Sequence, residues 1–128
     1  SCMWYAYCYA GSVRGVERVV RNMVQWTAPG GSCLLPVCDP DVLSKTRLPY
    51  RPPADSEDGR LEITAVIWNW IDEPSGRQHV GLVAPLIQHM RELFVPFFRR
   101  VDVLAYPAFK DDCLAVRSAI VATGRHGS

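Results

Sequence analysis

The sequence predicts an α/β fold with a mixed sheet that has a parallel part, an antiparallel last strand and an inserted β-hairpin. Two observations support this prediction. An amphipathic helical pattern at residues 13–26 ends at Pro29-Gly30-Gly31 and is followed by the apolar run SCLLPVCD at 32–39. Two later apolar runs, at 101–107 and 114–124, are joined by a short polar loop, so we expect them to be antiparallel neighbours.

Size and composition favour one globular domain. The chain has 128 residues, which we assign to a single domain, 1–128, with a loop and hairpin insertion at 39–84. Hydrophobic residues make up 48% of the chain and the formal net charge is +1. Such a small charge gives no long-range attraction for nucleic acid, so we expect no nucleic-acid partner. No apolar run has the length of a membrane span and no secretory signal is visible, so we expect a cytoplasmic protein without a membrane partner.

The first segment, SCMWYAYCY at residues 1–9, is apolar and aromatic and predicts the end of a buried strand. Gly11 interrupts it, and Ser12 offers a side-chain oxygen as an N-cap for the following helix. Strand, helix and the strand at 32–39 form a βαβ unit, so we expect the two strands to be parallel.

The helix at 13–26 follows from the spacing of its apolar side chains, which recur at intervals of three and four. They are Val13, Val16, Val19, Val20, Met23, Val24 and Trp26. Pro29 cannot continue a helix and Gly30-Gly31 accept positive φ, so the pattern predicts an end before them.

The second half of the chain predicts a loop, a hairpin, a helix and two strands. Residues 39–60 are rich in Pro, Asp, Arg and Ser and predict the loop. Residues 61–70 and 79–83 flank the turn DEPSGR and predict the hairpin. Pro85 suits the first turn of the second helix. Its predicted apolar stripe contains Leu86, Ile87, Met90, Leu93, Phe94 and Phe97.

The block GVERVVRNMVQWTAPGGSCLLPVCDP at 15–40 resembles the fourth helix and fifth strand of class I S-adenosylmethionine-dependent methyltransferases. SCMWYAYCYA resembles the end of the fourth strand with its catalytic loop. PLIQHMRELFVPFFRRVDVLAYP resembles the next helix and the sixth strand, and VRSAIVATGR the seventh strand, which is inserted antiparallel in that family. The resemblance implies the C-terminal half of a Rossmann-like methyltransferase sheet.

The family's cofactor motif, a Gly-rich turn between the first strand and its helix, has no counterpart in these 128 residues. The resemblance implies S-adenosylmethionine as cofactor and a small-molecule acceptor. We nevertheless expect the isolated chain to be inactive, because the half that grips the cofactor is not represented.

The resemblance also implies roles for the first segment. It puts Cys2, Met3 and Trp4 near the cofactor, and Tyr5 near the acceptor as a catalytic residue. Tyr7 and Tyr9 would bind the acceptor. The alternative interpretation is that these aromatic side chains simply fill the core.

Four positions further along the chain are candidates for the acceptor site. Asp39 follows the strand at 32–39, where α/β folds bind ligands, and is a candidate catalytic residue; its alternative is an Asx turn before Pro40. Trp68 and Trp70 share one face of a strand and are candidate substrate-binding residues. His79 is a candidate base, because its pKa lies near neutrality. The alternative is that Trp68 and Trp70 pack on the sheet and that His79 is a surface histidine.

Other functions remain open at this stage. Cysteine catalysis at Cys8 or Cys38 lacks a partnering base apart from His79, and the histidines show no metal spacing. The odd number of cysteines favours reduced thiols. The alternative to an enzyme is a non-catalytic α+β module that self-assembles or binds a partner. In either case an exposed sheet edge predicts a homo-oligomer.

Overall fold

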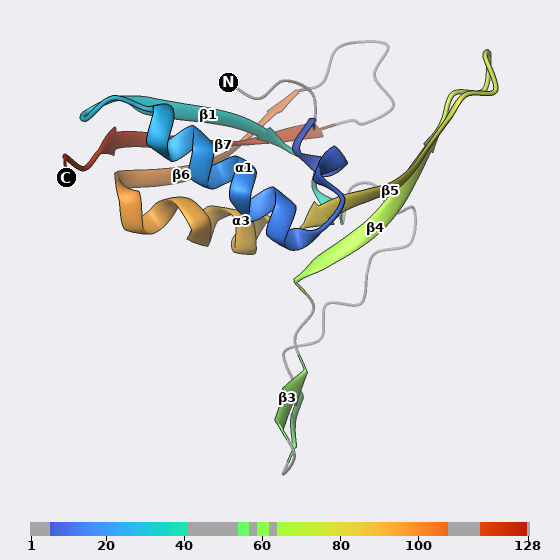
Figure 1. Cartoon of the computed structure of the whole chain (residues 1–128), viewed down its shortest axis with the longest axis horizontal. Helices are drawn as coiled ribbons and strands as arrows, with labels where there is room; N and C mark the ends of the chain where they lie inside the picture. The colour runs from blue at the N-terminus through green and yellow to red at the C-terminus, as the bar shows by residue number, and fades with distance from the viewer. Residues whose placement is uncertain (1–5, 41–53, 57–58, 62–63, 108–115, 128) are drawn as a thin grey trace.

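The computed structural model describes residues 6–40, 54–56, 59–61, 64–107 and 116–127. Within them the fold is mixed α/β, with two α-helices, two short 3₁₀ helices and seven strands. The helices are α1 (Val13–Trp26) and α3 (Ile87–Phe94). Figure 1 shows them side by side on one face of the largest sheet. This helix-on-sheet layering agrees with the predicted fold class at its coarsest level.

The largest sheet contains β1 (Ser32–Val37), β6 (Phe98–Pro107) and β7 (Val116–Arg125). The last strand lies in the middle, in the order β1-β7-β6, and pairs antiparallel with both neighbours. The predicted antiparallel pairing of the final two strands is therefore confirmed. Since both outer strands oppose β7, β1 and β6 run in the same direction without touching. Every paired strand among the described residues is antiparallel, so the predicted parallel pairing is not found.

The predicted strand at 1–9 is wrong over its described part, because Ala6–Ala10 forms the 3₁₀ helix η1. Residues 1–5 lie outside the described residues. The physical reason is visible in the burial of two adjacent side chains: Tyr7 is 1% exposed and Cys8 is 0% exposed. A strand points neighbouring side chains to opposite faces, whereas a tight helical turn allows both to enter the core.

The core lies between α1, α3 and the sheet. In α1 it takes Val16, Val20 and Val24, one residue per turn, which is the stripe that the spacing predicts. In β1 it takes every second side chain. The largest buried side chains of the other elements are Tyr7, Leu82, Met90, Phe94 and Ile120. Trp26 departs from the predicted stripe, since 80% of it is exposed at the end of α1.

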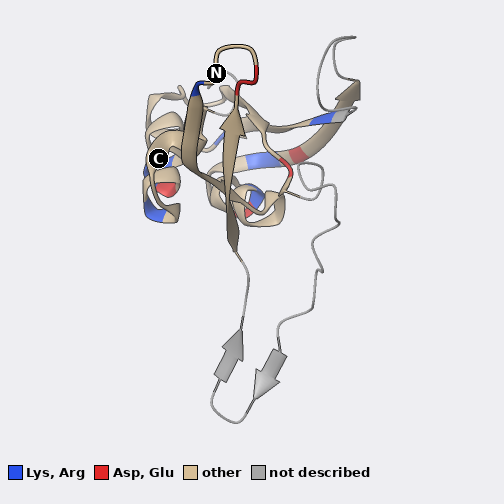
Figure 2. Cartoon of the chain, turned by 90° about the vertical axis from the view of Figure 1, so that its right-hand side faces the viewer, with Lys and Arg blue, Asp and Glu red and all other residues tan. Residues whose placement is uncertain are grey.

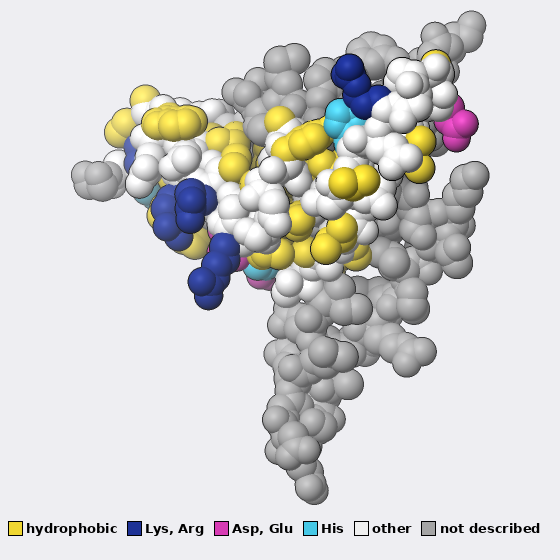
Figure 3. All heavy atoms as spheres, turned by 45° about the vertical axis from the view of Figure 1, so that its right-hand side comes forward, with side chains coloured by type: hydrophobic (Ala, Val, Ile, Leu, Met, Phe, Trp, Pro, Cys, Tyr) yellow, Lys and Arg dark blue, Asp and Glu magenta, His cyan; other side chains and the backbone are white. Residues whose placement is uncertain are grey.

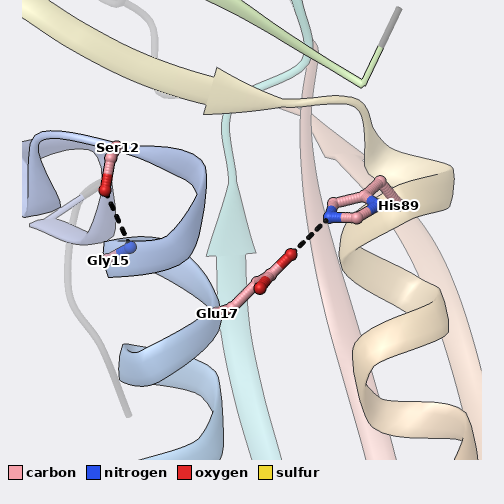
Figure 4. A network of polar contacts seen from close by, with 4 residues as sticks. All are labelled: Ser12, Gly15, Glu17 and His89. Carbon is pink, nitrogen blue, oxygen red and sulfur yellow. Dashed lines mark hydrogen bonds and ion pairs between the residues drawn. The ribbon is translucent and has the colours of Figure 1, made fainter. Parts of the chain in front are cut away.

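The start of α1 is capped as the sequence predicts. The Ser12 hydroxyl accepts a 3.0 Å hydrogen bond from the backbone N–H of Gly15 (Figure 4). One turn later, Glu17 Oε1 lies 3.4 Å from Nε2 of His89 on α3, which is an ion-pair distance rather than a well-formed hydrogen bond. The contact joins the two helices across the top of the core, and His89 is half-buried by it.

The end of α1 also follows the sequence. The helix stops at Trp26, and Thr27 is extended. Gly30 then adopts φ +77°, which only glycine accepts without strain. Its N–H donates a 2.8 Å hydrogen bond to the carbonyl oxygen of Arg125 at the end of β7. The Pro-Gly-Gly turn therefore connects the end of α1 to β1, an outer strand of the sheet.

The predicted hairpin is present, formed by β4 (Ala65–Ile71) and β5 (Gln78–Pro85). Pro85 is the last residue of β5, so the prediction that it opens the second helix is wrong; α3 starts at Ile87. Phe97, assigned to the apolar stripe of that helix, is 45% exposed in the 3₁₀ helix η2 (Val95–Phe97). A second hairpin, β2 (Ala54–Ser56) with β3 (Gly59–Leu61), stands apart from the helices in Figure 1.

The surface is mixed in character. Basic and acidic positions occur on both helices and strands (Figure 2). Hydrophobic side chains also reach the surface in several places (Figure 3). Those at least half exposed include Tyr9, Trp26, Ile67, Ile71, Val80 and Leu104. No helix of the described residues has the length and hydropathy needed to cross a membrane.

Candidate functional site

The candidate site lies where η1, the carboxyl end of β1 and the β4–β5 hairpin meet. Tyr7, Cys8, Cys38 and Leu82 belong to one buried cluster, against which Trp68 packs. The side chains form a buried inner group around Cys8 and an exposed outer group around His79.

The inner group is held by Tyr7. Its phenol oxygen accepts a 2.6 Å hydrogen bond from the backbone N–H of Cys38. Burial raises the pKa of the phenol far above its ordinary value, so Tyr7 stays neutral at any physiological pH. The hydrogen bond satisfies a backbone N–H just after β1 and fixes the two cysteine segments beside each other.

Cys8 is fully buried beside three hydrogen-bond donors. Its pKa is lowered chiefly by a hydrogen bond from the Cys38 thiol, with Tyr7 and the Trp68 indole acting in the same direction. Burial opposes these effects but does not outweigh them. The Trp68 Nε1 atom is buried and has no hydrogen-bond partner among the described residues. The donors therefore favour negative charge on this sulfur.

Cys38 behaves in the opposite way. Its pKa is raised, first because its thiol donates to Cys8 and then because it is buried. Negative charge on Cys8 and Asp39 raises it further, and Arg117 acts weakly in the other direction. The two thiols are therefore an unequal pair, because the pKa of Cys38 is raised and that of Cys8 is lowered.

The outer group consists of exposed aromatic side chains. The Tyr9 hydroxyl lies 3.2 Å from His79 Nδ1, and the two rings meet edge to face with centroids 5.9 Å apart. Trp70 is directly opposite His79 in the hairpin register and is 45% exposed. Tyr9 is 60% exposed. Together they present ring faces and edges to solvent beside an imidazole, which suits the stacking of an aromatic molecule.

A β-bulge sets the spacing of this outer group. The register shifts between Trp68 and Trp70, where Asn69 faces a kink of β5. Gly81 adopts φ +71° there, and its N–H donates a 3.0 Å hydrogen bond to Asn69 Oδ1. Bulges re-aim side chains near functional sites, and this one puts His79 within reach of Tyr9.

The structure describes six of the ten predicted site residues and brings three of them together. Tyr9, Trp70 and His79 form the outer group. Tyr7 is buried and supports the site rather than lining its surface. Trp68 is half-buried against the core, and Asp39 is half-buried next to Cys38. The remaining ones, Cys2, Met3, Trp4 and Tyr5, lie outside the described residues.

The pairing of Cys8 with Cys38 is the feature that the sequence prediction missed. Both thiols are free and completely buried, as reduced cysteines are expected to be. They come from separate elements, so no spacing rule in the sequence points to their contact. Within the described residues no three metal-ligating side chains gather.

An open groove of about 560 Å³ lies away from this site, between the end of α1 and the start of β1. Its lining is mostly apolar and comprises Val19, Asn22, Met23, Trp26, Thr27, Ser32, Cys33 and Leu34. None of the predicted site residues that the structure describes borders it.

The sequence matches no known family model, and no curated protein or solved structure is significantly similar to it. The site must therefore be interpreted from its own geometry.

Proposed function

We propose that this chain is the acceptor-side, C-terminal half of a class I S-adenosylmethionine-dependent methyltransferase acting on a small aromatic molecule. The observation that carries the proposal is the strand order β1-β7-β6. A last strand inserted antiparallel between the strand after α1 and the strand after α3 is the arrangement that the resemblance implies. Both helices also cover the same face of this sheet (Figure 1).

The location of the aromatic side chains supports an acceptor site. Tyr9 lies in η1, within the segment that resembles the family's catalytic loop, and it contacts His79, which pairs with Trp70. Methyl transfer from a sulfonium is an in-line displacement that depends mainly on alignment of donor and acceptor. Aromatic faces can hold a flat acceptor by stacking, and His79 can accept the proton that a hydroxyl or amine acceptor releases.

The cofactor must be treated separately from the acceptor. S-adenosylmethionine would supply the methyl group, and Cys2, Met3 and Trp4 are the residues that the resemblance assigns to it. These 128 residues contain no Gly-rich turn to hold its carboxylate tail. We therefore expect only weak binding by this chain, with an aromatic contribution to sulfonium affinity from the η1 region.

Titration of the isotopically labelled chain with S-adenosylmethionine, followed by NMR, tests the proposal. We expect weak, saturable shifts that concentrate on Tyr7–Tyr9 and on Cys38 and Asp39. A second titration with small aromatic amines should move the ring signals of Tyr9 and Trp70. Shifts confined to the α1–β1 groove, or no shifts at all, would exclude the proposal for this site.

A second candidate function is a non-catalytic module that self-assembles through its sheet edge. Within the described residues β1 pairs only with β7, and Leu34 of β1 and Trp26 at the end of α1 are both exposed. Exposed edge strands next to apolar surface pair readily with other chains. Sedimentation velocity distinguishes this candidate, because it requires a concentration-dependent dimer in the absence of any ligand.

A further inference from the structure

We propose that the flank of α1 beside the outer edge of β1 is a two-fold interface with a second copy of this chain, in which Trp26 of one copy stacks on the Arg18 guanidinium of the other. The inference rests on self-association, the second candidate function, and adds the surface and the contact responsible for it. Neither methyl transfer nor the outer group around His79 takes part in this interface.

The two outer strands of the largest sheet differ in charge. Among the described residues β1 and β6 each pair with β7 alone. β6 carries Arg99, Arg100 and Asp102, and charges on an outer strand discourage pairing with another chain. β1 contains no charged residue, and its Leu34 is 48% exposed. The edge of β1 is therefore the one that suits a contact with a second copy.

A backbone ladder cannot supply all the affinity at this edge. β1 contains Pro36, which has no N–H to donate to a neighbouring strand. Side chains must therefore contribute, and the groove between the end of α1 and the start of β1 provides them. It is mostly apolar and includes Val19, Met23 and Trp26 of the helix. Trp26 is the most exposed large hydrophobic side chain among the described residues, at 80%.

Arg18, Asn22 and Trp26 follow one another at intervals of four along α1 and form a single row on this flank. Asn22 and Trp26 line the groove, and Arg18 lies one turn before them at its rim. Arg18 is exposed and forms no ion pair with the described residues. Glu17, the only acidic residue of α1, lies instead beside His89 of α3 (Figure 4). The guanidinium of Arg18 is therefore available to a partner.

The row is self-complementary under two-fold symmetry. Its cation lies four positions before Asn22, and its indole lies four positions after it. When two α1 helices cross antiparallel at Asn22, each Trp26 meets the Arg18 of the other copy, so the same contact occurs twice. The electrons of an indole face attract a guanidinium placed over it. Stacking also removes two exposed indoles from water.

Sedimentation equilibrium of the full chain and its variants tests this contact. We expect a concentration-dependent dimer that Arg18→Ala weakens by about tenfold, since two exposed cation–π contacts are lost. In a Trp26→Ala background the same change should cost less than about twofold, because the partner of Arg18 is already missing. Arg21→Ala is the matched control and should leave the dimer unchanged. Arg21 is also exposed, but it projects about 100° away from Asn22 around the helix.

A mixture of the two single variants gives a second readout that a purely structural effect does not produce. Each homodimer lacks both contacts, whereas the heterodimer of Trp26→Ala and Arg18→Ala chains keeps one. We expect the heterodimer to be about threefold tighter than the geometric mean of the two homodimers, measured by fluorescence-detected sedimentation with one variant labelled.

The outcomes separate self-association from this particular interface. A wild-type chain that stays monomeric would overturn both. A dimer that the two substitutions weaken additively, or a heterodimer without the expected gain, would overturn the interface and leave self-association in place.

Discussion

The backbone N–H of Cys38 donates a 2.6 Å hydrogen bond to the phenol oxygen of Tyr7, 31 positions earlier in the chain. The bond joins η1 to the carboxyl end of β1, and both residues are essentially inaccessible to solvent. It therefore fixes η1 against the end of β1 inside the core, beside the candidate site. Several properties of the molecule depend on it.

Replacement of Tyr7 by Phe is expected to destabilise the fold. The change keeps the ring but leaves the Cys38 N–H buried without an acceptor, which costs about 1–3 kcal/mol. Urea unfolding followed by circular dichroism measures this free energy. Tyr9→Phe is the matched control, because the Tyr9 hydroxyl is on an exposed side chain and contacts only His79 in the described residues. We expect the control to change stability by less than about 0.5 kcal/mol. Equal losses in the two variants would contradict the role given to Tyr7.

Stability should depend on pH through Tyr7, Cys8 and Cys38. Tyr7 and Cys38 have raised pKa values in the folded state, chiefly through burial for Tyr7 and through the thiol pair for Cys38. Their contributions to the unfolding free energy are therefore fully present below their ordinary pKa values, 10.0 for Tyr7 and 9.0 for Cys38, and are lost as pH rises above those values. Cys8 has a lowered pKa, so its contribution is present above 9.0 and is lost as pH falls through the lower folded value. For these groups, stability is therefore greatest near pH 9.0 and falls on the alkaline side.

The alkaline limb of this profile is the sharpest part to measure. Each proton retained only by the folded state lowers the unfolding free energy by about 1.4 kcal/mol per pH unit. We expect the slope to steepen above pH 10.0, where the unfolded chain also loses the Tyr7 proton. Denaturant melts in reducing buffer up to about pH 11 provide the profile. In Tyr7→Phe the additional slope should disappear, and a flat wild-type profile would show that the phenol is not held in the core.

Gly15 is expected to tolerate no side chain. It lies in the first turn of α1, where alanine would ordinarily stabilise the helix by about 1 kcal/mol. A Cβ at this position would instead overlap the backbone carbonyl of Ala10 at the end of η1. Since neither backbone can move without disturbing the Ser12 cap, we expect Gly15→Ala to cost about 1–3 kcal/mol in thermal or urea melts. Gly127→Ala, whose nearest atom would be 4.0 Å away, should be neutral. A stabilised Gly15→Ala would mean that η1 does not pack as described.

Local signals explain which parts of the fold the sequence predicts. The Ser12 cap, the valine stripe of α1 and the Gly30 turn are all decided within a few residues, and each is present. The β4–β5 hairpin and the antiparallel final strands follow from short turns in the same way. The error at η1 has a different origin. An apolar aromatic run suits a strand or a buried turn equally well, and only the joint burial of Tyr7 and Cys8 decides between them.

The candidate site is less predictable because it is assembled from distant segments. The sequence singles out Tyr9 as an aromatic residue and His79 as a potential base. The two are 70 positions apart, however, and the hairpin bulge brings them together. The distance in sequence between Cys8 and Cys38 does not indicate that they share one buried cluster, since each cysteine alone is typical of an apolar run. His89 illustrates the same limit, because its contact with Glu17 joins two helices that are far apart in the sequence.

Trp70 is expected to matter for binding and not for folding. It is 45% exposed opposite His79, so truncation removes stacking surface without opening a cavity in the core. We expect Trp70→Ala to weaken the affinity for a small aromatic amine by about fivefold or more, equivalent to at least 1 kcal/mol of stacking, with a change in unfolding free energy below about 1 kcal/mol. NMR titration gives the affinity. Ile67→Ala, which alters a more exposed apolar side chain of the same strand, should leave it unchanged. Similar losses in both variants would place the ligand elsewhere on the hairpin.

Trp26 is expected to control self-association through the edge of the sheet. Its indole is 80% exposed at the end of α1 and borders the groove that follows the start of β1. Tryptophan contributes strongly to interfaces, so Trp26→Lys should weaken a dimer formed at this edge by at least tenfold, or about 1.4 kcal/mol. Sedimentation equilibrium measures the change, while urea melts should show an unaltered monomer because the side chain packs little. Val80→Lys adds the same charge at a site that is 67% exposed on the hairpin and should not affect the dimer. If the lysine at position 80 dissociates the dimer and the one at position 26 does not, then the hairpin forms the interface and the sheet edge does not.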